Sequence, residues 1–166
     1  MISRGASLGF YGGPLRDCVV ALKYQGRHRT AKRLAARLLE NDRCREILEH
    51  ADLIVGVPLH PDRLRHRGFN QAGLLAAALA GVCPGLVSHC LVRTRNTRSQ
   101  TDLGARGRRL NVLNAFSVRP DPALRSATVV LVDDVITTGA TLRECASTLL
   151  DHGAREVRSI TVARAE

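Results

Sequence analysis

The hydrophobic and polar positions of this chain follow two spacings, one typical of buried strands and one typical of amphipathic helices. Short apolar runs predict strands at residues 52–57, 86–92, 129–132 and 156–163. Apolar positions three and four residues apart predict helices at residues 14–24, 30–40 and 70–80, and after residue 141. Alternating strands and helices predict an α/β fold with a doubly wound, Rossmann-like parallel sheet, in a single domain over residues 1–166.

Two acids and a threonine-rich string follow the strand at 129–132. Asp133 and Asp134 come directly after four apolar residues, so the strand is expected to end at them. In open α/β sheets, ligands bind beyond the carboxyl ends of strands. The two acids are therefore expected at the rim of a cleft, where they can accept hydrogen bonds from vicinal hydroxyls.

The residues after the acids predict a phosphate-binding loop, which consists of Thr137, Thr138, Gly139, Ala140 and Thr141. They supply hydroxyls, a glycine with free backbone dihedrals, and a run of amides that begins a helix. The positive end of that helix would point at a bound phosphate. A P-loop is excluded, because G-x-x-x-x-G-K-[ST] does not occur in the chain.

A basic segment, Val57 to Gln71, follows the first predicted strand. In a doubly wound sheet it leaves the same edge of the sheet as the two acids. Arg63, Arg65 and Arg67 are then expected close to the phosphate loop, where guanidinium groups can hold pyrophosphate bidentately. Taken alone, the segment is more typical of a solvated basic loop than of a binding site.

These segments together resemble the type I phosphoribosyltransferases, whose motif for phosphoribosyl pyrophosphate (PRPP) has apolar residues, two acids, two apolar residues and then TTGAT. The strings VPLH at 57–60, RGFNQ at 67–71 and LKYQG at 22–26 are similar to those of the competence-protein ComF-like (ComF/GntX) family. The middle of the chain shows that family's residue order: Arg93, Thr97, Gln100, Arg109, Asn111 and Phe116. Many such proteins carry an N-terminal four-cysteine zinc element, which this sequence lacks.

The resemblance implies roles for particular residues. Asp133 and Asp134 would be the catalytic acids, which bind the ribose hydroxyls and, directly or through water, Mg²⁺. The 5′-phosphate would bind to Thr137, Thr138, Gly139, Ala140 and Thr141. Pyrophosphate would bind to Leu59, His60 and Arg67. A flexible loop at 93–111 would close over PRPP with Arg93, Gln100 and Arg109, although a charged loop without a catalytic part is the alternative. Lys23 is interpreted as a helix-surface residue without a catalytic role.

Composition narrows the classes of function. No apolar run approaches a membrane span and the N-terminus lacks a signal peptide's apolar core, so a cytoplasmic protein is expected. The five cysteines are widely spaced without a C-x-x-C pair, which favours neither a zinc ribbon nor a disulfide framework. The net charge of +10 is carried mainly by arginine and permits a polyanionic partner.

The resemblance therefore implies a Mg²⁺-dependent phosphoribosyltransferase that transfers ribose 5-phosphate from PRPP to an acceptor and releases pyrophosphate, associated by family with competence and DNA uptake. The acceptor and the oligomeric state are left open by the sequence. One alternative is a DNA-binding accessory of natural transformation that contacts single-stranded DNA, although 3% aromatic residues is low for base stacking. Another is a PRPP-sensing regulator without turnover.

Overall fold

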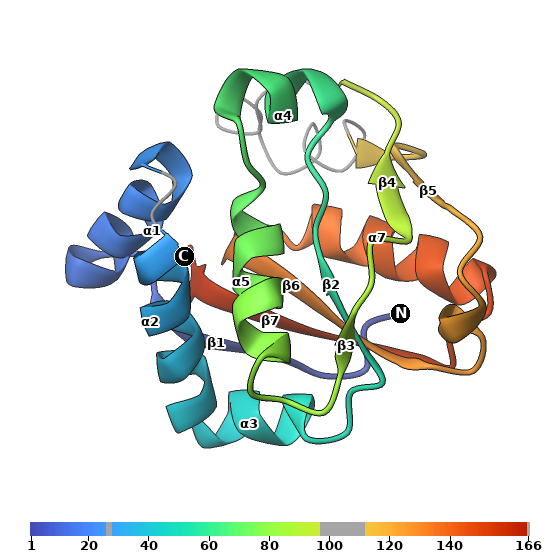
Figure 1. The fold of residues 1–166 in the computed structure, drawn as a ribbon, viewed down its shortest axis with the longest axis horizontal. Helices are drawn as coiled ribbons and strands as arrows, with labels where there is room; N and C mark the ends of the chain where they lie inside the picture. The colour runs from blue at the N-terminus through green and yellow to red at the C-terminus, as the bar shows by residue number, and fades with distance from the viewer. Residues whose placement is uncertain (26–27, 97–111, 166) are drawn as a thin grey trace.

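A five-stranded parallel sheet forms the centre of the computed structural model, which describes residues 1–25, 28–96 and 112–165 (Figure 1). Its strand order is β1-β7-β6-β2-β3, and every neighbouring pair is parallel. The strands are β1 (Gly5–Phe10), β2 (Leu53–Gly56), β3 (Leu86–Val87), β6 (Thr128–Ile136) and β7 (Glu156–Arg164). The predicted α/β fold with a parallel sheet is confirmed.

Helices cover both faces of this sheet, and each face has its own hydrophobic cluster. Four helices pack on one face: α1 (Gly13–Gln25), α2 (His28–Glu40), α3 (Asp42–Leu48) and α5 (Gln71–Ala80). The other face is covered by α7 (Ala140–Asp151) and by a small second sheet. Because β6 is buried on both sides, its residues alternate between the two clusters, which explains the unbroken apolar run at 129–132.

The central strand β6 differs from its prediction at one end. It continues beyond Asp133 and Asp134 to Ile136, and Asp133, Val135 and Ile136 still pair with β7. The expectation that the strand ends at the acids was wrong, because β7 extends far enough to provide hydrogen-bond partners for these residues. The two acids thus lie on a fixed strand and not in a loop.

The predicted strand at 86–92 is divided in the structure. Its first part is β3 in the main sheet, and its second part is β4 (Leu91–Arg93), which pairs antiparallel with β5 (Phe116–Val118). The Ser88 hydroxyl accepts a hydrogen bond from the Cys90 amide and donates one to Asp121, at 3.1 and 2.6 Å. This turn breaks the apolar run and moves β4 to the other side of the molecule.

Four further elements were not predicted. Strand β1 lies at the edge of the sheet, where a glycine-containing, half-buried segment gives a weak apolar pattern. Helix α3 is short and begins at Asn41, whose side chain accepts the Cys44 amide. Within the basic segment, α4 (Pro61–Arg67) forms, and a 3₁₀ turn covers Pro122–Leu124. Over the described ranges, no helix is long and apolar enough to cross a membrane.

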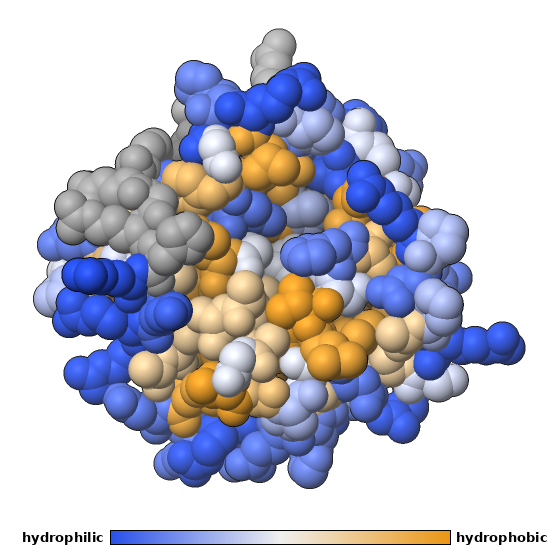
Figure 2. Space-filling view, viewed as in Figure 1, coloured by the Kyte–Doolittle hydropathy of each residue, from blue (hydrophilic) through white to orange (hydrophobic). Residues whose placement is uncertain are grey.

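Charge is unevenly distributed over the helical face. Figure 2 shows apolar side chains gathered over α5 and β3, with hydrophilic side chains around them. Helix α5 carries no charged residue. In contrast, the exposed positions of α2 are mostly basic: Arg29, Lys32, Arg33 and Arg37. A basic surface on α2 thus lies beside the apolar surface over α5 and β3.

Candidate functional site

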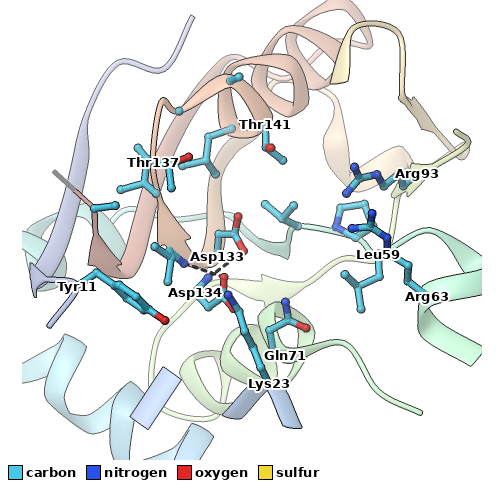
Figure 3. Close-up of a pocket in the computed structure, with 18 of the residues that line it drawn as sticks. Tyr11, Lys23, Leu59, Arg63, Gln71, Arg93, Asp133, Asp134, Thr137 and Thr141 are labelled. Carbon is cyan, nitrogen blue, oxygen red and sulfur yellow. Dashed lines mark hydrogen bonds and ion pairs between the residues drawn. The ribbon is translucent and has the colours of Figure 1, made fainter. Parts of the chain in front are cut away.

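A cavity of about 380 Å³ lies at the carboxyl ends of the central strands (Figure 3). Its floor is the end of β6 with Asp133 and Asp134. One wall is the threonine loop, residues 137–141, which leads into α7. A second wall, here called the arginine wall, consists of Arg63, Arg67 and Arg93. The cavity therefore brings acids, hydroxyls and guanidinium groups together from separate parts of the chain.

The two acids are held by the backbone of their own strand. Asp133 Oδ1 accepts the amide of Asp134 at 2.8 Å, and Asp134 Oδ1 accepts the amide of Val135 at 2.7 Å. Successive strand residues point to opposite faces of the sheet. Asp134 accordingly lies toward α1, whereas Asp133 lies toward α7. The carboxylates are fixed before a ligand arrives, and they differ in their surroundings.

Two groups, one on the floor of the cavity and one in the arginine wall, have perturbed pKa values. Burial, and next the neighbouring Asp134 carboxylate, raise the pKa of Asp133 well above its usual value. Burial also lowers the pKa of the Arg93 guanidinium, and the nearby charge of Arg63 adds to this effect. Groups with perturbed pKa values cluster at functional sites, which favours this cavity as the candidate site.

Lys23 contributes a positive charge to the cavity, whereas the sequence pattern predicts it on the helix surface. Its Nζ lies 3.2 Å from Asp134 Oδ2, and the two side chains are 27% and 7% exposed. Lys23 also lines the cavity. The only sequence signal for it was its place in the LKYQG string, because the α1 pattern alone does not show that this side chain reaches the end of β6.

The threonine loop contains a glycine in the left-handed backbone conformation. Gly139 has φ 70° and directly precedes α7, and the first residues of this helix lie at the cavity. Thr137, Gly139, Ala140 and Thr141 line the cavity. Thr138 is not among the lining residues; its hydroxyl accepts the Ala140 amide at 3.4 Å and its carbonyl accepts Arg143 at 2.8 Å. Thr138 thus shapes the loop.

The basic segment forms a helix, and this decides which arginines reach the cavity. Arg63 and Arg67 are four residues apart and lie on one face of α4, so both line the cavity. Arg65 lies on another face, is 74% exposed and pairs with Asp62. The expectation that Arg65 lies at the site was therefore wrong. The Arg67 guanidinium donates to Gln71 Oε1 at 2.7 Å, and Gln71 is itself buried at the cavity.

Leu59 and His60, which were both predicted to bind pyrophosphate, take different positions at the start of α4. Leu59 lines the cavity, whereas His60 is not a lining residue. The Nδ1 of His60 accepts the Asp62 amide at 3.2 Å and so caps α4, which begins with Pro61 and ends at Gly68 with φ 82°. His60 thus has a structural role at the start of α4, and its contact with pyrophosphate stays a prediction.

Arg93 lies in a fixed element and not in a loop. It ends β4, is 7% exposed, and its guanidinium carbon lies 5.4 Å from the centre of the Phe116 ring on β5. It lines the cavity beside α4. The other two residues of the predicted flexible loop, Gln100 and Arg109, lie outside the described residues.

The carboxylate oxygens in the cavity are suited to a hard cation that also binds to the substrate. In the part of the chain that the structure describes, no group of three or more His, Cys, Asp or Glu side chains could hold a metal ion. Two carboxylates face a basic wall instead. Mg²⁺ commonly binds through one or two carboxylates together with substrate phosphates and water, so Asp133 and Asp134 fit Mg²⁺ in the presence of a phosphate ligand.

Comparisons with known proteins agree with this architecture. Residues 22–166 match the family model of the phosphoribosyl transferase domain, so the chain belongs to the phosphoribosyltransferase domain family. It is 39% identical over 159 residues to DNA utilization protein YhgH of Salmonella typhimurium, covering 93% of this chain and 69% of that protein. It is 35% identical over 167 residues to competence protein F of Haemophilus influenzae, covering 95% and 71%. Within the family, the chain is a ComF-like member, as its motifs predicted.

Solved structures support the fold at lower identity. The allosteric regulatory enzyme of purine biosynthesis is 23% identical with a TM-score of 0.53, covering 87% of this chain and 30% of that one. Orotate phosphoribosyltransferase from Aeropyrum pernix is 19% identical with a TM-score of 0.50, covering 85% and 63%. These likenesses show the type I phosphoribosyltransferase fold.

Proposed function

We propose that this chain binds PRPP together with Mg²⁺ and transfers its ribose 5-phosphate to an acceptor, with release of pyrophosphate. The observation that carries the proposal is the arrangement of one cavity in which two fixed acids stand between an amide-rich threonine loop and a wall of arginines. PRPP has a phosphate at one end, vicinal hydroxyls in the middle and a pyrophosphate at the other end, and the cavity offers a matching group for each.

Each group would act by binding and orientation. The amides at the start of α7 and the hydroxyls of Thr137 and Thr141 would hold the 5′-phosphate. Asp133 and Asp134 would accept hydrogen bonds from the ribose hydroxyls. The arginine wall would hold pyrophosphate by charge-assisted hydrogen bonds. Asp133 and Asp134 would also hold Mg²⁺, which would supply charge that stabilises the departing pyrophosphate.

The fixed geometry of these groups suits catalysis by positioning. Asp133 and Asp134 are oriented by backbone amides at 2.8 and 2.7 Å, so they need little rearrangement when the sugar binds. Asp133 and Asp134 would also place negative charge near C1′, where positive charge develops as pyrophosphate leaves. The chain's own contribution is therefore orientation of the sugar and stabilisation of charge at both ends of the breaking bond.

The double substitution Asp133→Asn with Asp134→Asn tests this proposal. It removes negative charge while keeping side-chain volume, so the variant is expected to fold but to lose at least roughly hundredfold in PRPP affinity. Pyrophosphate release across a panel of bases and amines, and PRPP binding by calorimetry, are the two measurements. Unchanged PRPP affinity would remove the site assignment, and tight binding without release over the panel would favour a PRPP-sensing regulator.

We infer a second role, binding of single-stranded DNA, from the basic exposed face of α2 and from the names of the relatives, a DNA utilization protein and a competence protein. Arg29, Lys32 and Arg33 lie exposed on this helix, and phosphate contacts from such residues would be sequence-tolerant and salt-dependent. Reversing the charge of these three residues is expected to weaken DNA binding strongly at low salt. Affinity that does not change between low and moderate salt would contradict this role.

A further inference from the structure

The cavity has a third wall, formed by Tyr11 and Lys23, which the groups that would hold PRPP leave unused (Figure 3). Tyr11 follows β1, and Lys23 lies in the last turn of α1. In the sheet, β6 with the acids stands between β7 and β1 on one side and β2 on the other. The arginines of α4 follow β2. The third wall thus lies across the acids from these arginines.

This third wall is tied to the ends of the central strands. The Tyr11 amide donates to the Arg164 carbonyl at 2.8 Å, and the Ala165 amide donates to the Ile136 carbonyl at 2.8 Å. The ends of β1, β7 and β6 are thereby joined by backbone hydrogen bonds beside the cavity. Tyr11 is 36% exposed, so its ring stands at the cavity on a fixed backbone and remains accessible to a ligand.

The stereochemistry of the transfer points to the acceptor on this side, if the proposed function holds. The lone pair of an acceptor atom forms a bond to C1′ while the C1′–O bond breaks, and the electron pair leaves with pyrophosphate. The acceptor then gives up its proton to water. An in-line displacement requires the acceptor to approach opposite the leaving group. Since pyrophosphate would lie at the arginine wall, the acceptor must approach from the side of Tyr11 and Lys23.

We propose that Tyr11 and Lys23 form the acceptor subsite and that it takes a flat heterocycle with a ring carbonyl oxygen. The Tyr11 ring offers an apolar face for stacking. The Lys23 ammonium only donates hydrogen bonds, and Asp134 at 3.2 Å fixes its position and balances its charge. A ring carbonyl satisfies this donor, whereas an amino group in its place would present a donor to a donor. Hypoxanthine and uracil fit this chemistry, and adenine does not.

Nucleoside 5′-monophosphates test the subsite without turnover, because they carry base, sugar and phosphate but no pyrophosphate. Calorimetry with ribose 5-phosphate measures the sugar-phosphate part alone. Inosine and uridine monophosphates are expected to bind roughly tenfold or more tightly than ribose 5-phosphate, and adenosine monophosphate close to ribose 5-phosphate. The readout is the ratio of the nucleotide affinity to the ribose 5-phosphate affinity. Any change in binding of the sugar and phosphate affects both affinities and cancels in this ratio.

Three variants and one control localise the effect. Tyr11→Ala is expected to bring the oxo-nucleotide affinity down to that of ribose 5-phosphate, and Lys23→Met to remove the preference over adenosine monophosphate. Lys23→Arg keeps a donor at this position and should retain the preference. Phe10→Ala is the matched control, since Phe10 packs on the Arg164 guanidinium at 4.5 Å and is not among the residues that line the cavity; it should change neither ratio.

The outcomes separate this inference from the proposed function. If ribose 5-phosphate binds but all three nucleotides bind no more tightly, or if Tyr11→Ala leaves the gain intact, the acceptor subsite is wrong while the PRPP site stands. A preference for adenosine monophosphate would overturn the carbonyl assignment. If neither ribose 5-phosphate nor PRPP binds, the proposed function itself fails.

Discussion

The two sides of the cavity are built in opposite ways. The β6–α7 side comes from one continuous segment, residues 128–142, in which strand, acids, threonine loop and helix follow each other directly. The arginine wall is assembled from α4 and β4, which lie far apart in the sequence and belong to different parts of the fold. Local sequence therefore determines the first side, whereas the second side exists only after the chain has folded.

This difference suggests how each side responds to substitution. Groups on the β6–α7 side are oriented by backbone hydrogen bonds and by a left-handed glycine, so changes there should alter geometry and stability together. Groups of the arginine wall are long side chains that contribute charge and hydrogen bonds. Changes there should lower affinity for one end of the ligand and leave the fold intact.

Substitutions in the arginine wall should lower PRPP affinity strongly. Arg63→Ala with Arg67→Ala removes two guanidinium groups on one face of α4, each worth roughly tenfold, so PRPP affinity is expected to fall about hundredfold. Ribose 5-phosphate affinity should hardly change, because that ligand lacks the pyrophosphate. Arg65→Ala on the same helix is the matched control and should bind PRPP like the parent. Equal losses for both ligands in calorimetry would contradict the division between the two sides.

The ion pair between Lys23 and Asp134 at the floor of the cavity is expected to stabilise the folded protein. Lys23→Met leaves a carboxylate that is only 7% exposed without its cation, which is expected to lower the free energy of unfolding by about 2 kcal/mol. Denaturant unfolding measures the loss. Lys32→Met, an exposed lysine on α2, should cost little. A Lys23 variant as stable as the parent would show that Asp134 does not depend on this charge.

Gly139 gives the smallest expected effect and the most local one. Alanine at φ 70° is strained by about 1 kcal/mol, and its Cβ would lie 3.0 Å from the Arg143 guanidinium. Gly139→Ala should therefore lower stability by roughly that amount and weaken ribose 5-phosphate binding. Gly12→Ala is the control, because a Cβ there meets nothing within 4 Å and its φ is not positive. Loss of pyrophosphate binding alone in Gly139→Ala would contradict the account.

The sequence predicted the first side of the cavity well and the second only in part. The apolar run, Asp133, Asp134 and TTGAT are adjacent, so their order alone predicts strand, acids, loop and helix. The exclusion of Arg65 depended on α4 being helical, which a seven-residue segment with three arginines does not reveal. Lys23 and Tyr11 reach the cavity through the packing of α1 and the pairing of β1 with β7, and both are long-range features that local patterns do not encode.

Calorimetric titration of PRPP with Mg²⁺ into the parent protein and into Asp133→Asn/Asp134→Asn tests the central claim most directly. The account expects one saturable site per chain in the parent, with an affinity higher than that of ribose 5-phosphate or pyrophosphate alone, and loss of this binding in the double variant. Absence of PRPP binding in the parent, or the same affinity in both proteins, would contradict it.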